Sequence, residues 1–288
     1  MAEAGNRKFA ISIVRLSFQQ SAQSKIDVSP QWYKTMDRIT KEANFRYVAR
    51  GEGVDDACDI MLLVGWTHGT QPSAAFLPQS PAASAGHGNL DAVFAPLLPF
   101  LSQRPRVRTL WHTYERANAN LLTTSFRGRG FNDPIMEFMT IRGPPGVVGP
   151  EVKAIESTLS EFWERREMSR FDEDVYRDTF DGVLLASLDD GLDAHETPSE
   201  PGATTFVIFL KWSSREGRAE FQDPTISDPT IGPAQANYPI DFWREQVAKP
   251  LQRLVEEGAT ISSWDYHKAK LATDKRGSQL VANASDIW

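Results

Sequence analysis

Two strand-like segments carry ionisable side chains that are suited to proton transfer. Aligning the segments on Trp111 and Trp264 pairs Leu110 with Ser263 on one face, because side chains alternate along a strand. Ionisable groups inside strands often serve acid or base catalysis. The catalytic candidates on this face are His112 with Tyr114, and Asp265 with His267. Either pair would deprotonate a carbon next to a carbonyl and hold the enolate, unless the groups only end strands or form hydrogen bonds across the sheet.

Aromatic residues and one more histidine are candidates for substrate contact. The tryptophans recur in both halves of the chain, so packing explains them first, but aromatic walls also suit a large apolar ligand. His68 follows a strand-like run and lies either at the mouth of a pocket or in a plain surface loop. The substrate-binding candidates are His68, Trp66, Trp111, Trp212, Trp264 and Tyr266.

Several chemistries with recognisable motifs are not indicated. The sequence has no Gly-x-Ser-x-Gly elbow, no P-loop and no complete dinucleotide fingerprint. Its five histidines and one cysteine show no zinc-ligand spacing. We therefore expect no cofactor and no metal site, although haem on one axial histidine, His112 or His68, stays an open alternative.

The segments that hold these residues recur along the chain. The runs 60–66 and 205–212 are apolar, end in tryptophan and are each followed by a polar turn and a helix-like segment that ends in phenylalanine. The pattern Val-x-x-Pro-Leu then appears at 93–97 and again at 247–251, and each copy precedes a strand centred on tryptophan. Landmarks in the same order at similar spacing indicate a duplicated unit.

Each copy is predicted to fold as β-α-β-β-α-β, the ferredoxin-like order. The first copy has strands at 9–16, 45–49, 60–66 and 107–114, a helix that begins at Pro30 with Ser29 as its N-cap, and a kinked helix at 91–101. The second has strands at 135–141, 180–188, 205–212 and 260–268, and helices from Pro150, at 215–221 and at 239–257. The expected domains are a first repeat at 1–118, a linker at 119–132, a second repeat at 133–272 and a tail at 273–288.

The central strands are apolar on both faces, which predicts that the face away from the helices is also covered. Two units in one chain would supply that cover by closing into an α+β barrel of about eight strands. The element order and the echoes Leu62-Leu-Val-Gly-Trp66 with Phe76, and Phe209-Leu-Lys-Trp212 with Phe221, resemble the dimeric α+β barrel superfamily. The likeness is to its fused two-repeat form, common in fungal proteins of specialised metabolism.

The resemblance implies a pocket between the sheet and the helices of one unit. Members of the superfamily include cofactor-free monooxygenases, polyketide cyclases, lactone isomerases, haem enzymes and proteins with no known reaction. Our leading hypothesis is a cofactor-independent cyclase, isomerase or lyase that acts on a hydrophobic polyketide- or terpenoid-type intermediate. This hypothesis includes a pericyclase. The alternatives are a cofactor-free monooxygenase on a polyketide and a non-catalytic ligand-binding or stress-related protein.

Composition narrows the expected partners and location. The 288 residues carry 31 basic and 38 acidic side chains, a net charge of −7, which disfavours nucleic-acid binding. No apolar window is long enough for a transmembrane helix, so no membrane partner is expected. The single Cys58 excludes an intrachain disulfide and favours the cytoplasm. The expected partner is a hydrophobic small-molecule substrate, and the chain is either a monomer or a homodimer.

Overall fold

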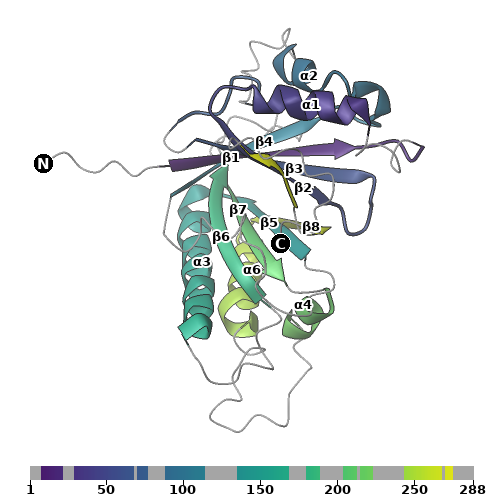
Figure 1. Ribbon diagram of the computed structural model, residues 1–288. Coiled ribbons are helices and arrows are strands. Elements are labelled where there is room, and N and C mark those ends of the chain that lie inside the picture. Colours follow the sequence, from purple (N-terminus) through teal and green to yellow (C-terminus); the bar gives the residue numbers. More distant parts are fainter. Residues whose placement is uncertain are drawn as a thin grey trace, which may run out of the picture. The chain divides into compact units, whose positions relative to one another are not determined.

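A computed structural model describes residues 8–21, 29–67, 70–76, 88–113, 135–168, 180–188, 204–212, 215–222, 243–267 and 270–274. The chain forms two compact units, which combine helices with an antiparallel sheet (Figure 1). The first unit holds the described residues up to 113, together with 186–188, 266–267 and 270–274. The second holds the remaining described residues between 135 and 265. The predicted domain boundaries at 118 and 132 lie outside the described residues and stay predictions.

The first unit has the predicted β-α-β-β-α-β order. Its sheet runs β4-β1-β3-β2, which is the fourth-first-third-second strand order of a ferredoxin-like unit, and a further strand, β9, adds to the β2 edge. The elements are β1 (Lys8–Ser17), α1 (Pro30–Thr40), β2 (Phe45–Glu52), β3 (Asp59–Trp66), α2 (Gly88–Phe94), the 3₁₀ turn η3 (Leu98–Phe100), β4 (Arg106–Thr113) and β9 (Lys270–Asp274).

The second unit repeats this order. Its sheet runs β8-β5-β7-β6, so its strands too stand in the order fourth, first, third, second. The elements are β5 (Ile135–Gly143), α3 (Pro145–Met168), β6 (Phe180–Leu188), β7 (Thr204–Trp212), α4 (Arg215–Gln222), the π-helical turn η5 (Arg244–Ala248), α6 (Lys249–Glu256) and β8 (Thr260–His267). No helix in the described parts of either unit is long and apolar enough to cross a membrane.

The core of the first unit lies between its sheet and its helices. Every residue of β3 is buried, as its unbroken apolar run predicts. The side chains of Leu62, Val64 and Trp66 pack in one cluster with the apolar stripe of α1, which includes Trp32 and Met36. Helices α1 and α2 lie on the same side of this sheet (Figure 1). The Ser29 hydroxyl accepts the Trp32 N–H at 3.2 Å, so the predicted helix start is confirmed.

The opposite face of β3 is buried as well. Met61 and Leu63 point away from the helices, and both are fully buried, as is the neighbouring Ile11 of β1 at 3 % exposure. Burial on both faces therefore agrees with the pattern of the sequence.

Prolines interrupt the helices more than the sequence predicts. The helix expected at 91–101 ends at Phe94 and is followed by the separate 3₁₀ turn, because Pro96 and Pro99 lack the N–H that would continue it. In the second unit, the N–H of Lys249 bonds the carbonyl of Arg244, a π-type spacing that directly precedes Pro250.

Two other local predictions need correction. Helix α3 begins at Pro145, and Pro150 lies inside it, so the stronger start signal is the earlier proline. The helix-like segment expected before Phe76 is a turn over residues 74–76. Its short polar sequence, with Pro72, forms turns as readily as a helix.

Strand β9 was not predicted, because the segment from Thr273 shows little periodicity. In the structure, residues 270–274 pair antiparallel with β2, with Tyr47 opposite Asp274 and Arg50 opposite Lys270. A five-residue strand is too short to show a hydrophobic period, and its pairing comes from backbone groups at a free sheet edge.

A glycine in β3 allows an aromatic ring to lie on the sheet. Gly65 stands opposite Tyr47 of β2, and a Cβ at Gly65 would lie 2.1 Å from Cε1 of that ring. Burial raises the pKa of Tyr47 to about 12. The ring therefore occupies the space that any larger residue at position 65 would need.

We expect Gly65→Ala to lower the free energy of unfolding by about 1–3 kcal/mol, because the new methyl group overpacks against the Tyr47 ring. Urea unfolding measures this change. The double variant Gly65→Ala/Tyr47→Ala should lose less than the sum of the two single variants. Additive losses would contradict the close contact.

Candidate functional site

A buried carboxyl group lies on β5 in the second unit. Glu137 is 5 % exposed, and one of its carboxylate oxygens accepts the Nε1–H of Trp212 at 2.9 Å. The guanidinium of Arg218, on α4, lies 3.7 Å from that oxygen and donates to Oδ1 of Asp265 on β8 at 2.6 Å. Ser263, also on β8, bonds the Glu137 side chain. We call Glu137, Trp212, Arg218, Ser263 and Asp265 the Glu137 cluster.

Strand pairing and one short connection bring these groups together. Glu137 is opposite Leu210 of β7, and Trp212, two residues further along, ends that strand. A short connection then leads into α4, so Arg218 lies at the second turn of a helix that begins three residues after Trp212. Ser263 and Asp265 are two residues apart on β8 and share a face. Trp212 also makes an edge contact with Trp243, with ring centroids 5.7 Å apart.

The pKa of Glu137 is raised above its ordinary value. Burial is the main cause, and the negative charge of Asp265 adds to it. The Arg218 charge and the hydrogen bonds from Trp212 and Ser263 act in the opposite direction but do not cancel it. A carboxyl group with a raised pKa holds its proton closer to neutral pH, as a general acid or base requires.

The cluster is more accessible on the side of α4 and β8. The side chain of Glu137 is 6 % exposed, that of Asp265 11 % and that of Arg218 17 %. Ser263 is exposed. Ser263, Asp265 and Arg218 therefore form the more exposed side of the cluster, and Glu137 the buried side.

The first unit has neutral groups at the matching place. There the Nε1–H of Trp66 donates to the Ser12 hydroxyl at 2.9 Å, and Ser12 lies 2.9 Å from the Thr109 hydroxyl. Thr109 in turn donates to the Phe76 carbonyl at 2.8 Å. Ser12 faces Val64, two residues before Trp66, as Glu137 faces Leu210, two residues before Trp212.

These contacts correct the alignment of the two fourth strands. Thr109 bonds the acceptor of the Trp66 indole, and Ser263 bonds the acceptor of the Trp212 indole. Thr109 therefore corresponds to Ser263, rather than to Ser262 as the alignment on tryptophans has it. A shift of one residue moves every side chain to the opposite face, so Asp265 corresponds to Trp111 and not to His112.

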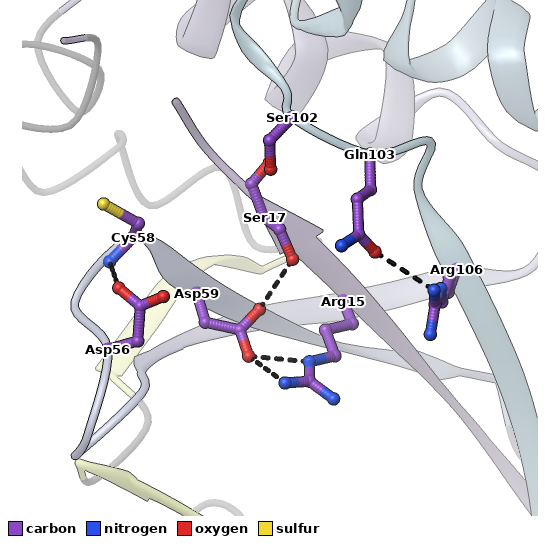
Figure 2. Close-up of polar contacts among 8 residues, drawn as sticks. All are labelled: Arg15, Ser17, Asp56, Cys58, Asp59, Ser102, Gln103 and Arg106. Carbon is purple, nitrogen blue, oxygen red and sulfur yellow. Dashed lines mark hydrogen bonds and ion pairs between the residues drawn. The ribbon is translucent and has the colours of Figure 1, made fainter. Parts of the chain in front are cut away.

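Tyr266 belongs to a second polar cluster, in the first unit. Figure 2 shows Arg15 and Ser17 of β1 directed at the Asp59 carboxylate at the start of β3. The Nε of Arg15 donates to Oδ2 at 2.6 Å, and the Ser17 hydroxyl donates to Oδ1 at 3.1 Å. Tyr266 also bonds Asp59. Burial, the Asp59 charge and this bond raise the pKa of Tyr266 to about 12, although the Arg15 charge opposes the shift.

The other predicted site residues are placed in part. Trp264 and His267 on β8 are half-buried. His112 and Trp111 lie on β4, but only their backbone is described. His68 and Tyr114 lie outside the described residues. The roles of all six stay predictions.

Sequence reasoning missed Glu137 and Arg218. A lone carboxylate in the otherwise apolar run Ile135-Met-Glu-Phe-Met139 was a usable signal for Glu137, because ionised groups are rarely buried without a partner. Arg218 gave no such signal in its polar helix. Within the residues that the structure describes, no three His, Cys, Asp or Glu side chains are placed to bind a metal ion.

We expect Glu137→Gln to change how stability depends on pH. The folded-state pKa of Glu137 is raised, so its contribution to stability is full below the unfolded-state pKa, about 4.3, and is lost as pH rises through the folded-state value. The unfolding free energy of Glu137→Gln should therefore improve relative to wild type as pH rises from 4 to 8. Urea unfolding followed by tryptophan fluorescence measures it. Glu256→Gln, at an exposed site on α6, is the control, and parallel curves for all three proteins would contradict the assignment.

We expect Tyr266→Phe to remove one phenol that ionises at about pH 12. The phenol of an unfolded chain ionises near pH 10, so the contribution of Tyr266 to stability is full below pH 10 and is lost between about 10 and 12. The difference in phenolate absorbance between wild type and variant, recorded while circular dichroism shows both folded, gives the midpoint. A midpoint near 10 would contradict the burial of this phenol beside the Asp59 carboxylate.

The comparisons with known proteins are informative at the level of fold. No family model matches the chain, and no curated protein matches it. An anthrone oxidase-like protein of solved structure is 11 % identical, with 96 % of this chain and 97 % of that chain covered and a TM-score of 0.50. Two proposed monooxygenases, from Lactobacillus acidophilus and Fusobacterium nucleatum, are 10 % and 6 % identical over 93 % and 94 % of this chain and 96 % of theirs, with TM-scores of 0.42 and 0.46.

At 11 % identity, the first of these likenesses speaks for the fold and leaves the reaction open. It extends over nearly the whole of both chains. The chain thus has an α+β fold similar to that of this anthrone oxidase-like protein.

Proposed function

We propose that this protein is a cofactor-independent enzyme that moves a proton to or from a hydrophobic substrate at the Glu137 cluster. The observation that carries the proposal is the buried Glu137 carboxyl with its raised pKa, held between the Trp212 indole and the Arg218 guanidinium. Perturbed ionisable groups of this kind gather at catalytic sites. The expected reaction is a cyclisation, isomerisation or lyase step on a polyketide- or terpenoid-type intermediate.

Each charged group of the Glu137 cluster has a role in this proposed reaction. Glu137, as carboxylate, takes a proton from a carbon next to a carbonyl, and the electron pair of the broken C–H bond moves to the carbonyl oxygen as an enolate. Arg218 supplies the positive charge that stabilises this oxyanion, and Asp265 holds Arg218 in place at 2.6 Å. Glu137 then returns the proton to another carbon, which isomerises the substrate. Alternatively, the enolate carbon attacks a second carbonyl carbon of the same substrate, the π bond of that carbonyl breaks, and the resulting alkoxide takes the proton from Glu137.

Trp212 fixes the orientation of the Glu137 carboxyl group. Its N–H bonds one Glu137 oxygen at 2.9 Å, and its fully buried ring packs against Trp243. The carboxyl group is thereby held in one orientation, which lowers the entropic cost of reaching a reactive arrangement. The two indole rings also give the site apolar surroundings that suit a hydrophobic substrate.

We also propose that the two units arose by duplication. The two units share their element order, strand order and tryptophan contacts, which supports their origin by duplication. Closure of the units into one intramolecular barrel, a cytoplasmic location and a monomeric or homodimeric state remain predictions. So do catalytic roles for His112, Tyr114 and His267.

A second candidate is a cofactor-free monooxygenase, which the likeness to an anthrone oxidase-like protein favours. An anthrone would lose a proton from its CH₂ carbon to Glu137, and the carbanion would react with O₂ to give a peroxide anion, which takes the proton back from Glu137 and becomes a hydroperoxide. Loss of water then leaves a quinone, so that one O₂ converts the CH₂ group to a carbonyl and releases one H₂O. Both candidates begin with the same proton abstraction and therefore depend on the same carboxyl group.

The test follows the exchange of the CH₂ protons of 1,8-dihydroxyanthrone in D₂O by NMR, without oxygen and then in an oxygen electrode. We expect wild type to accelerate exchange and Glu137→Gln to lower the enzymatic rate by about 10²–10⁴-fold. Asp265→Asn should lower it less, since Asp265 acts through Arg218. Glu216→Gln, an exposed carboxylate on the same helix as Arg218, is the control and should leave the rate unchanged.

The outcomes separate the candidates. Exchange without oxygen consumption supports the isomerase or cyclase, and exchange with stoichiometric oxygen consumption supports the monooxygenase. A folded Glu137→Gln protein with the full rate would exclude Glu137 as the proton carrier. Binding without exchange or oxidation would favour the non-catalytic ligand-binding protein.

A further inference from the structure

We infer that, of the two matching places among the described residues, the one in the second unit binds the substrate and the one in the first unit is closed to ligands by a series of neutral hydrogen bonds. The inference rests on the proposed function for the role of the site. It goes further in assigning that function to one of the two units and in identifying the strand position, 12 or 137, that makes the difference.

The two places correspond closely. In each unit, a tryptophan at the end of the third strand is buried to 1 % exposure or less, and its N–H donates over 2.9 Å to a side chain on the first strand. That side chain is Ser12 in the first unit and Glu137 in the second. Both stand opposite the residue two before the tryptophan, Val64 or Leu210. The difference between the units is therefore one of chemistry at a shared position.

In the first unit the direction of every hydrogen bond is fixed. The Phe76 carbonyl can only accept, so the Thr109 hydroxyl donates to it. The Ser12 hydrogen is then directed to the Thr109 oxygen, and the Ser12 oxygen accepts from the Trp66 indole. Each of the three donors is used within the protein. The indole, the two hydroxyls and the carbonyl in this series of hydrogen bonds all stay neutral near pH 7.

These hydrogen-bonded groups are also buried within the first unit. Ser12 is 0 % exposed and Thr109 is 2 % exposed. The ring of Phe76, whose carbonyl ends the series of hydrogen bonds, packs edge-on against Trp66 with centroids 5.0 Å apart and against Phe94 at 6.3 Å. A ligand would have to displace buried aromatic rings to reach any polar atom here.

The second unit differs in both respects. Its shared position carries a carboxyl group, and the neighbours are the ionised Arg218 and Asp265. These neighbours retain 17 % and 11 % exposure, and Ser263, which takes the place of Thr109, is exposed. An incoming hydroxyl or carbonyl group can thus exchange for water at Arg218 and Asp265 before it reaches Glu137. The chemistry fits an apolar ligand that carries a phenol or enol.

The test is the stoichiometry of binding of 1,8-dihydroxyanthraquinone, measured by calorimetry and by quenching of tryptophan fluorescence. We expect one molecule per chain. Glu137→Gln or Arg218→Met should weaken binding at least tenfold, whereas Thr109→Ser, which keeps the hydroxyl chain, and Ser12→Ala should change it less than twofold. Circular dichroism and urea unfolding at the same pH show whether each variant is folded, and Thr109→Ser serves if Ser12→Ala is not.

Two sites per chain, or equal weakening by the Ser12 or Thr109 variants, would overturn the inference. Failure to bind the probe at all would overturn the ligand class. These results are distinct from failure of the proposed function. One-to-one binding that depends on Glu137 and Arg218, but without proton exchange in 1,8-dihydroxyanthrone, would support the single site and reject the catalysis.

Discussion

A buried indole N–H must have a hydrogen-bond acceptor, and both units of this protein are built around that requirement. Trp66 and Trp212 end the central strands and are almost fully buried. An unpaired N–H at either place would cost about 1–3 kcal/mol, so each unit supplies an acceptor from the adjacent first strand. The acceptor is a hydroxyl in one unit and a carboxyl in the other, and the remaining polar groups of each site follow from that choice.

A buried hydroxyl acceptor needs only neutral partners, whereas a buried carboxyl acceptor needs charged ones. Ser12 needs only Thr109 and a backbone carbonyl to satisfy it. Glu137 requires a cation, and Arg218 in turn requires Asp265, because buried charges are tolerated only when they are paired and hydrogen-bonded. Packed apolar residues would often be as stable as such an arrangement. The proton transfer proposed for Glu137 would account for such an arrangement at this place in the second unit, where the first unit has Ser12.

The elements were largely predictable and the site largely was not. Apolar runs such as β3, and the Ser29-Pro30 start of α1, depend on neighbours in the sequence and were confirmed. The short strand β9 escaped prediction because its pairing with β2 depends on a sheet edge more than two hundred residues away in sequence. Asp265 was identified from its place in β8, but its partners lie on β5 and α4, which no local pattern connects.

The sequence by itself determined the order of helices and strands, the burial of the central strands and the recurrence of the tryptophans, because these follow from periodicity and side-chain type. Tertiary structure alone decided which residues of the fourth strands correspond. Thr109 matches Ser263 through contacts with Ser12 and Glu137, one residue away from the match on tryptophans. The physical reason is that strand register is set by pairing across the sheet, and a shift of one residue exchanges the two faces without altering the pattern along the chain.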